Sequence, residues 1–241
     1  MSSTKKNLLI TLGDSWTEGY GSYLPEAMKE YQSDKDLIKL QTDSADWMSA
    51  HCWPAYLARI LNCDLINLGY RGSANSAHAK WLLDQKIDSA YERVQVVWLL
   101  SDPYRFSFYS VEHEKRKRDV LNFAPVGILH NRVDCEPAIK TLAENYLSLI
   151  DMGGVVKETQ FYIRIVENYC QLANYNLLIG NAFTPTIFDS KHNLHTGQVY
   201  NSMRQFLGDN IKTTSSVCSH PNDLGYQKIS EELAQILQKL V

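Results

Sequence analysis

The sequence predicts an α/β fold with a mostly parallel, doubly wound sheet, on the evidence of two patterns. Four short apolar runs have the length of buried strands, and stretches with helical spacing of apolar residues lie between them. Strands that alternate with helices favour parallel pairing through right-handed crossovers. No repeat, low-complexity tract or Gly/Ser linker divides the chain, so we expect a single domain over residues 1–241. The expected strands are residues 7–12, 64–68, 94–100 and 176–181.

The expected helices follow from apolar periodicity and from helix-breaking residues. The last helix has the clearest pattern, with apolar side chains at helical spacing that would pack on the sheet. These side chains are Leu224, Ile229, Leu233, Ile236, Leu237 and Leu240. Pro137 is typical of a helix start, and the pair Gly153 and Gly154 is typical of a break between helices. The other expected helices are residues 53–61, 74–90, 137–150 and 155–173.

Two stretches are too long for simple connections in a minimal α/β core. Residues 20–50 are rich in Tyr, Asp and Ser, and residues 104–136 are aromatic and charged. Both follow expected strand ends, where long loops commonly shape a substrate site; a solvent cap or an oligomer contact is the alternative. Aromatic residues in and near these inserts either stack on sugar rings or pack in the core. They are Tyr20, Tyr23, Trp47, Trp53, Tyr104, Phe106, Phe108 and Tyr109.

The composition is that of an ordinary globular protein, with 44% hydrophobic and 21% charged residues. A formal net charge of −3 gives no global attraction for nucleic acid or for an anionic membrane, so we expect neither as a partner. The one basic run, residues 115–118, is flanked by Glu112, Glu114 and Asp119. A solvated surface is therefore favoured over a binding patch. No segment of the sequence approaches the length of a transmembrane helix.

The N-terminus and the cysteines suggest a cytoplasmic protein. Residues 1–7 are polar and basic and the first expected strand begins at once, so we expect no signal peptide. The cysteines are scattered without a CxxC spacing, which is typical of reduced thiols in a cytosolic chain. They are Cys52, Cys63, Cys135, Cys170 and Cys218.

Gly13, Asp14, Ser15 and Trp16 end the first expected strand abruptly. Open α/β folds hold their ligands at the carboxyl ends of the strands, so this turn lifts a serine hydroxyl to the functional edge of the sheet. A serine there is a candidate nucleophile when a base lies within hydrogen-bond reach. The alternative is a turn in which Asp14 or Ser15 only caps the next helix.

His220 is the candidate base. It precedes the last helix, where a loop can reach back over the sheet edge, and an imidazole suits proton transfer near neutral pH. A helix-capping or surface histidine is the alternative. His192, His195 and Asp189 resemble a metal cluster, but no Cys or Glu completes the ligand spacing. We expect neither a metal nor another cofactor.

Residues 13–16 and 219–226 resemble the first and last sequence blocks of the SGNH (GDSL-type) hydrolases. The resemblance implies a flavodoxin-like three-layer αβα sandwich in which Ser15 attacks an ester and His220 is the general base. It also implies short acyl esters, often acetyl groups on carbohydrate, so the expected partner is a small-molecule or carbohydrate ester. The mechanism of this family needs no metal or cofactor.

The middle blocks of the family supply the oxyanion hole. By its spacing from the second strand, Gly72 matches the family's glycine, whose backbone N–H binds the oxyanion beside that of Ser15. The third block departs from the family, because Asp102 stands at the oxyanion-hole position of an asparagine. A carboxylate repels an oxyanion unless it is protonated or turned away, and Ser101 or Arg105 are the alternative donors. The residues expected to bind substrate around this site are Asp14, Trp16, Asn75, Ser101 and Arg105.

The last block departs as well, because Val217 stands where the family usually has an aspartate, three residues before the histidine. In a serine-protease triad, an Asp→Asn change lowers kcat by about 10⁴. A backbone carbonyl could orient His220 in a Ser–His dyad, a carboxylate such as Asp189 or Asp209 could take over, or the enzyme is weak or inactive. The alternatives to an ester hydrolase are therefore an SGNH-fold binding or assembly protein, or an acyltransferase with the same Ser–His pair.

Overall fold

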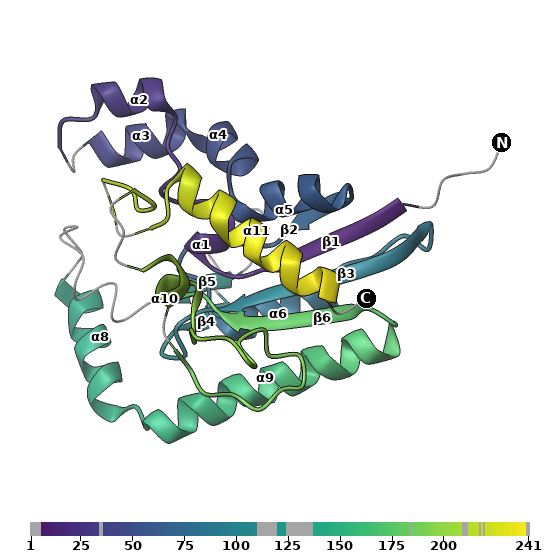
Figure 1. Ribbon diagram of the computed structural model, residues 1–241. Coiled ribbons are helices and arrows are strands. Elements are labelled where there is room, and N and C mark those ends of the chain that lie inside the picture. The colour runs from purple at the N-terminus through teal and green to yellow at the C-terminus, as the bar shows by residue number, and fades with distance from the viewer. Residues whose placement is uncertain are drawn as a thin grey trace.

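A central parallel sheet organises the molecule, as the sequence predicts. The computed structural model describes residues 6–33, 36–109, 120–123, 137–183, 185–208, 212–216, 218 and 220–239. The sheet has four parallel strands in the order β2-β1-β3-β6 (Figure 1). They are β1 (Lys6–Leu12), β2 (Asp64–Asn67), β3 (Tyr91–Leu100) and β6 (Asn176–Asn181). The predicted α/β class is confirmed.

The strand order reverses direction between β1 and β3. β1 pairs with β2 on one side and with β3 on the other, and Leu12 lies opposite Trp98 near the carboxyl ends of β1 and β3. Such a switch point leaves a crevice between the loops that follow two neighbouring strands, and open α/β sheets bind ligands there. Ser15 follows β1 and Asp102 follows β3, so the topology brings both residues to one edge of the sheet.

Helices cover both faces of the sheet, because its strands are apolar on both sides. One face packs against α5 (Trp53–Leu61) and α11 (Asp223–Lys239). The other face packs against α6 (Asn75–Leu83) and α9 (Met152–Leu172) (Figure 1). The result is the three-layer αβα arrangement that the sequence resemblance implies.

Two predicted helices differ from the structure at their ends. α6 ends at Leu83 instead of residue 90, because the chain beyond it is mostly polar and exposed. α11 begins at Asp223, and Leu224 in its first turn is 44% exposed instead of packing on the sheet. The prediction for Leu240 falls outside the described residues.

The glycine pair opens a helix instead of breaking one. α9 begins at Met152, and the Asp151 carboxylate accepts hydrogen bonds from the N–H groups of Gly153 at 3.1 Å and Gly154 at 2.9 Å. The cap satisfies two backbone N–H groups of the first turn, and this offsets the low helix propensity of the two glycines. A further short helix, α10 (Met203–Leu207), was not predicted.

The first insert folds as three short helices at the carboxyl edge of the sheet (Figure 1). Tyr23, Leu40 and Met48 form a small core of their own within it. None of the three helices is longer than seven residues, so apolar periodicity did not reveal them. They are α2 (Pro25–Glu30), α3 (Leu37–Asp43) and α4 (Ala45–Ala50).

The second insert is described in part. It contains an antiparallel hairpin of β4 (Phe106–Tyr109) and β5 (Val120–Phe123), which the sequence did not predict. α8 (Pro137–Leu149) follows it and confirms the predicted helix at this place. The basic run at residues 115–118 and Cys135 lie outside the described residues.

Several insert aromatics pack within the protein. Trp53 lies in the main core and Tyr23 in the small core. Trp47 stacks on His51 with 3.7 Å between ring centroids. The core-packing interpretation is confirmed for Trp53 and Tyr23, whereas Trp47 is half-buried and lies outside the core clusters of the described residues.

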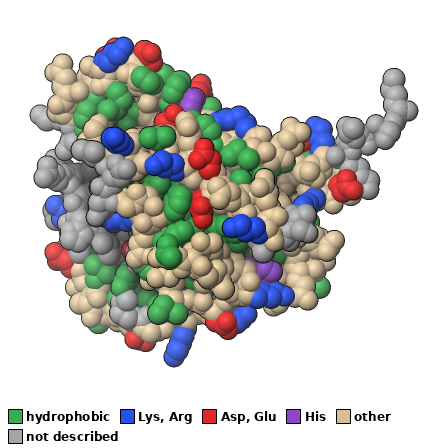
Figure 2. Space-filling view, viewed as in Figure 1, with side chains coloured by type: hydrophobic (Ala, Val, Ile, Leu, Met, Phe, Trp, Pro, Cys, Tyr) green, Lys and Arg blue, Asp and Glu red, His purple; other side chains and the backbone are tan. Residues whose placement is uncertain are grey.

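The surface shows no single dominant charge on the face seen in Figure 2, where basic and acidic side chains are interspersed. Across the part of the chain that the structure describes, no helix is both long and apolar enough to cross a membrane. Cys52, Cys63, Cys170 and Cys218 are free thiols.

Candidate active site

The serine turn is built by a helix cap and by a close approach of the backbone. Asp14 caps α1 (Ser15–Glu18), and its carboxylate accepts the N–H of Trp16 at 3.0 Å. A side chain at Gly13 would collide with the side chain of Thr17. The sequence therefore needs glycine before the acidic cap, and this pairing starts the helix at the serine.

Ser15 and His220 lie within hydrogen-bond distance although 205 residues separate them in the sequence. The Ser15 Oγ and the His220 Nε2 are 2.8 Å apart. For Nε2 to accept the serine proton, the neutral imidazole must carry its own proton on Nδ1. Ser15 is only 7% exposed, so a reacting group approaches it in a largely desolvated place. This geometry is what a nucleophile and its base require.

The imidazole of His220 is enclosed without a carboxylate partner. Burial, reinforced by the guanidinium groups of Arg105 and Arg71, lowers its pKa from the ordinary 6.5 to about 4. Its Nδ1 has no hydrogen-bond partner among the residues that the structure describes. Val217 and Ser219, which precede His220 in the sequence, are outside the described residues. The described surroundings therefore favour the neutral ring.

The carboxylates considered in the sequence analysis do not reach this ring within the described residues. Asp189 is 88% exposed and pairs with Arg164 at 2.6 Å, so its assignment as a partner of the base is wrong. Asp209 lies outside the described residues. The metal-like cluster is also dispersed: the His195 Nε2 accepts the N–H of Asn181 at 2.9 Å. No three His, Cys, Asp or Glu side chains gather at a metal-like site in the described ranges.

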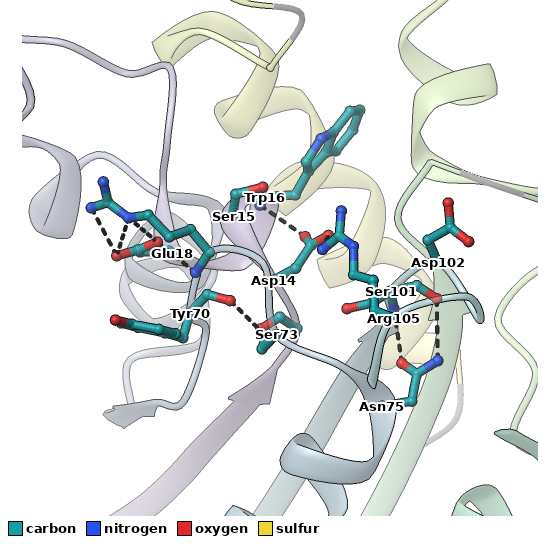
Figure 3. Close-up of polar contacts among 12 residues, drawn as sticks. Asp14, Ser15, Trp16, Glu18, Tyr70, Ser73, Asn75, Ser101, Asp102 and Arg105 are labelled. Atoms are coloured by element: carbon teal, nitrogen blue, oxygen red, sulfur yellow. Dashed lines mark hydrogen bonds and ion pairs between the residues drawn. The ribbon is translucent and has the colours of Figure 1, made fainter. Parts of the chain in front are cut away.

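Asp14 and Arg105 form a buried ion pair beside the serine turn (Figure 3). The Arg105 Nη1 donates to the Asp14 Oδ2 at 2.6 Å, and Asp14 has no exposed surface. The guanidinium also lies 5.1 Å from the ring centroid of Phe183. Asp14 therefore caps the helix and binds Arg105. Because it is fully buried, the prediction that Asp14 contacts substrate does not fit the structure. Arg105 is near enough to His220 to lower the pKa of that imidazole.

Asn75 ties the start of α6 to the end of β3. Its Oδ1 accepts the N–H of Ser101 at 2.9 Å, and its Nδ2 donates to the Ser101 carbonyl at 3.2 Å (Figure 3). Asn75 is buried and its amide is committed to this pair, so it positions the strand end and does not face a substrate. The Ser101 hydroxyl is buried and has no partner within the described ranges.

Asp102 caps the turn that leaves β3. Its carboxylate accepts the N–H of Tyr104 at 3.2 Å, and its carbonyl accepts the N–H of Arg105 at 3.1 Å. Burial raises the pKa of Asp102, and the Tyr104 hydrogen bond and Arg105 oppose that rise. In Figure 3 the carboxylate does not point toward Ser15. This orientation does not support the predicted place of Asp102 in an oxyanion hole.

The loop of residues 69–74 carries the other expected oxyanion donor. Gly72 has a φ of +74°, a left-handed conformation that favours glycine. Within the described residues nothing accepts its N–H, and a Cβ atom on it would meet no atom within 4 Å. Gly72 thus has an N–H without an acceptor among the described residues and open space where a Cβ atom would lie.

Two side-chain networks that the sequence did not predict hold this loop. Arg71 binds the Glu18 carboxylate through its Nε and Nη2, and its backbone N–H donates to the same carboxylate at 2.8 Å. Behind the loop, the Trp98 Nε1 donates to the His78 Nδ1 at 3.0 Å, and the His78 Nε2 lies 2.5 Å from the Ser73 Oγ. These contacts join segments that share no sequence pattern, so no spacing signals them.

Neither the Trp16 ring nor the described cavity faces a substrate at the serine hydroxyl. Trp16 belongs to the main core, with its ring 6.2 Å from that of Phe183, so the predicted substrate contact is replaced by packing. A cavity of about 490 Å³ is lined by residues from 21–28, 214–216 and 222–224, and Ser15 is not among them. The cavity therefore lies beside the loop of the histidine, not over the nucleophile.

Comparison with known proteins finds distant neighbours in structure. No family model matches the chain, and no curated protein matches its sequence. TesA is 13% identical, with a TM-score of 0.48 over 98% of this chain and 100% of TesA. The psychrotrophic esterase EstA from Pseudoalteromonas sp. is 14% identical. Its TM-score is 0.47, and the match covers 97% of this chain and 98% of EstA. A carbohydrate esterase is 16% identical. Its TM-score is 0.46, and the match covers 99% of this chain and 66% of the esterase. Similarities at this level do not fix the activity of this chain.

Proposed function

We propose that the chain is a serine-dependent ester hydrolase of the SGNH type, in which Ser15 and His220 act as a catalytic dyad. The observation that carries this proposal is the 2.8 Å separation of the Ser15 Oγ and the His220 Nε2 at the carboxyl edge of a parallel sheet. A serine hydroxyl is a weak nucleophile alone and needs such a base to take its proton.

The proposed reaction has two halves. In the first, the Ser15 Oγ bonds to the ester carbonyl carbon while its proton passes to the His220 Nε2, which leaves a tetrahedral oxyanion. Collapse of this intermediate breaks the bond to the leaving alkoxide, which takes the proton from His220. In the second, water attacks the acyl-serine by the same proton transfers, and the free acid leaves with the Ser15 hydroxyl restored.

The backbone N–H groups of Ser15 and Gly72 are the proposed donors to the oxyanion. The N–H of Gly72 has no acceptor among the described residues, which leaves it free for a ligand. Arg105, anchored by Asp14, adds positive charge close to the dyad. One oxyanion donor is typically worth about 10²–10³ in rate. We propose Arg105 as the replacement for the asparagine that the family has at the position of Asp102, because it is a cation near the dyad.

We infer that the substrate carries a short acyl group, such as acetyl, on a carbohydrate or another small ester. Ser15 and Trp16 are nearly buried, which leaves little room beside the hydroxyl for a long acyl chain. The carbohydrate part of this inference comes from the sequence resemblance. An acyltransferase uses the same Ser–His pair and differs only in whether water or an alcohol attacks the acyl-serine.

A binding or assembly protein on the same fold is the second candidate, and the state of His220 favours it. A base whose pKa is lowered to about 4, with no described partner on Nδ1, takes up a proton poorly. Against this candidate, the Ser15 Oγ and the His220 Nε2 lie within hydrogen-bond distance, as ester hydrolysis needs. Binding alone does not need this contact.

Hydrolysis of p-nitrophenyl acetate and butyrate by the wild type and two serine variants tests the proposal. Ser15→Ala is expected to abolish turnover. Ser22→Ala is the matched control, because Ser22 is also buried and its hydroxyl has no described partner, so its activity is expected to stay near that of the wild type. Full activity of Ser15→Ala overturns the nucleophile assignment. No turnover together with no labelling by a fluorophosphonate favours the binding protein, and acetyl transfer to an added alcohol favours the acyltransferase.

A further inference from the structure

Tyr20 is the aromatic residue in contact with the base of the proposed dyad. Its ring and the imidazole of His220 meet edge to face, with 4.8 Å between centroids and an interplanar angle of 70°. Tyr20 is itself fixed at three points. The Gln41 Nε2 donates to its hydroxyl at 2.6 Å, the Tyr226 hydroxyl donates to its carbonyl at 2.7 Å, and the Arg71 guanidinium lies 5.1 Å from its ring centroid.

Two glycines set the course of the backbone on either side of Tyr20. Gly19 and Gly21 have φ angles of +100° and +106°, which side chains rarely allow. A Cβ atom on Gly21 would lie 2.8 Å from the Cβ of His220 and 2.6 Å from the Pro221 carbonyl oxygen. The Tyr20 segment therefore packs directly against the loop that carries His220. The Tyr20 ring lies against the imidazole in a fixed position.

Among the described residues, no group around His220 supplies the negative charge that normally orients a catalytic imidazole. The Nδ1 has no partner in the described part of the chain. The nearby cations, Arg71 and Arg105, are each paired with a carboxylate. Burial raises the pKa of the Cys218 thiol on the same loop and that of the Tyr20 hydroxyl, so both stay neutral near pH 7. Within the described part of the chain, the Tyr20 ring contacts this imidazole, which also has its hydrogen bond with Ser15.

We propose that Tyr20 is the positioning residue of His220 and does by packing what a carboxylate does by hydrogen bonding. This inference rests on the proposed function, because it has meaning only where His220 is the base. The Tyr20 ring stops the imidazole from rotating away and keeps its Nε2 on the Ser15 hydroxyl. It fixes geometry and supplies no charge. Misplacement of a reacting group by about 1 Å can cost about 10²-fold in rate.

Two substitutions of Tyr20 and one control test this role with p-nitrophenyl acetate. Tyr20→Leu removes the ring, and its kcat is expected to fall about 10- to 100-fold while KM changes less than about threefold. Tyr20→Phe keeps the ring and gives up only the Gln41 hydrogen bond, so its kcat is expected to stay within about threefold. Tyr175→Leu is the control, because it removes a ring from a similar edge contact with Tyr169 in the core on the other face of the sheet; its kcat is expected to be unchanged.

A double-mutant cycle separates positioning from a general loss of folding. In a His220→Ala background, Tyr20→Leu is expected to lower the residual activity no further, because the base that it positions is gone. An equal further loss in that background, or an unchanged kcat for Tyr20→Leu alone, overturns the inference. Should Tyr20→Leu fail to fold by circular dichroism, Tyr20→Met fills the space without a rigid ring and carries the same expectation.

The failure of this inference is distinguishable from failure of the proposed function. If Ser15 is labelled by a fluorophosphonate and Tyr20→Leu keeps the wild-type kcat and labelling rate, the dyad is supported and the positioning role of Tyr20 is contradicted. If the wild type neither turns over the ester nor becomes labelled, both the proposed function and the role of Tyr20 are contradicted.

Discussion

The serine side and the histidine side of the proposed dyad are held by different forces. On the serine side, Asp14 caps the helix that Ser15 starts, and Asn75 locks the end of β3 with two hydrogen bonds. On the other side, His220 packs against the Tyr20 ring, and its Nδ1 has no described partner. One half of the site is built from directional polar contacts, and the other half from packing.

The difference teaches what each kind of support can supply. Hydrogen bonds and ion pairs in a buried place fix both geometry and charge. An aromatic contact fixes geometry but does little to stabilise the imidazolium that forms when His220 takes the serine proton. We therefore expect a well-positioned nucleophile and a weak base, and the changes below are ways to break or sharpen that contrast.

The largest effect is expected from His220→Ala. Loss of the base should lower kcat/KM for p-nitrophenyl acetate by about 10²–10⁴, because nothing else described lies within reach of the serine proton. His51→Ala is the control, since His51 stacks on Trp47 in the first insert and does not touch the dyad. Equal activity of His220→Ala and the wild type would show that another group is the base.

Asp14→Asn should break the polar support on the serine side. An asparagine oxygen can still cap the helix, but Arg105 loses its counter-charge in a place where it is only 15% exposed. Removing one partner of such a buried pair should lower the free energy of unfolding by about 2–4 kcal/mol, measured by urea unfolding. Asp43→Asn, which breaks an exposed pair with Lys39, should change stability little. Equal stability of the two variants would mean that the buried pair does not hold the turn.

Acid should destabilise the fold through its buried histidines. Burial lowers the pKa of His220 and of His195 from 6.5 to about 4. Between these values the unfolded chain binds protons that the folded chain does not, so stability falls as the pH falls from about 6.5 toward 4. The Tm at pH 4.5 should lie below the Tm at pH 7, and His220→Ala should reduce the difference. A Tm that does not change over this range would contradict the buried, neutral state of both rings.

Val217→Asp restores the carboxylate that the sequence resemblance leads one to expect. The position is outside the described residues, so this test comes from the sequence. A carboxylate that binds Nδ1, as the resemblance implies for this position, should raise the pKa of His220. The acid limb of the kcat/KM profile should then shift to higher pH, and kcat should rise about tenfold. Val217→Asn, with the same shape and no charge, is the control. If neither variant moves the profile, another contact already orients the base.

The smallest effect is expected at Asp102. Because its carboxylate caps a turn with the N–H of Tyr104, Asp102→Asn keeps that acceptor and should change kcat less than about threefold. A gain of about 10² would place this side chain in the oxyanion hole after all.

The sheet and the pair Ser15 and His220 could be predicted from the sequence because each depends on local pattern. Apolar runs of strand length mark β1, β2, β3 and β6, and a glycine-acid-serine turn and a histidine before the last helix mark the two ends of the site. Matching of sequence blocks could not show that Asp102 faces its own turn. The direction of the Asp102 side chain depends on the conformation of its loop, and a match of sequence blocks contains no information on that conformation.

The supporting contacts could not be predicted, because they join distant segments by shape. Arg71 meets Glu18 across 53 residues, and Tyr20 meets a loop from the other end of the chain. One signal was present: Tyr20 lies between Gly19 and Gly21, and glycines on both sides of an aromatic residue indicate a backbone path that other residues avoid.

The most direct test of the Ser15–His220 dyad is the rate of fluorophosphonate labelling, with the adduct located by peptide mass spectrometry in the wild type and in His220→Ala. We predict a single adduct on Ser15, formed about 10²-fold or more slowly in His220→Ala. An adduct on a different serine, or equal rates in the two proteins, would contradict the dyad.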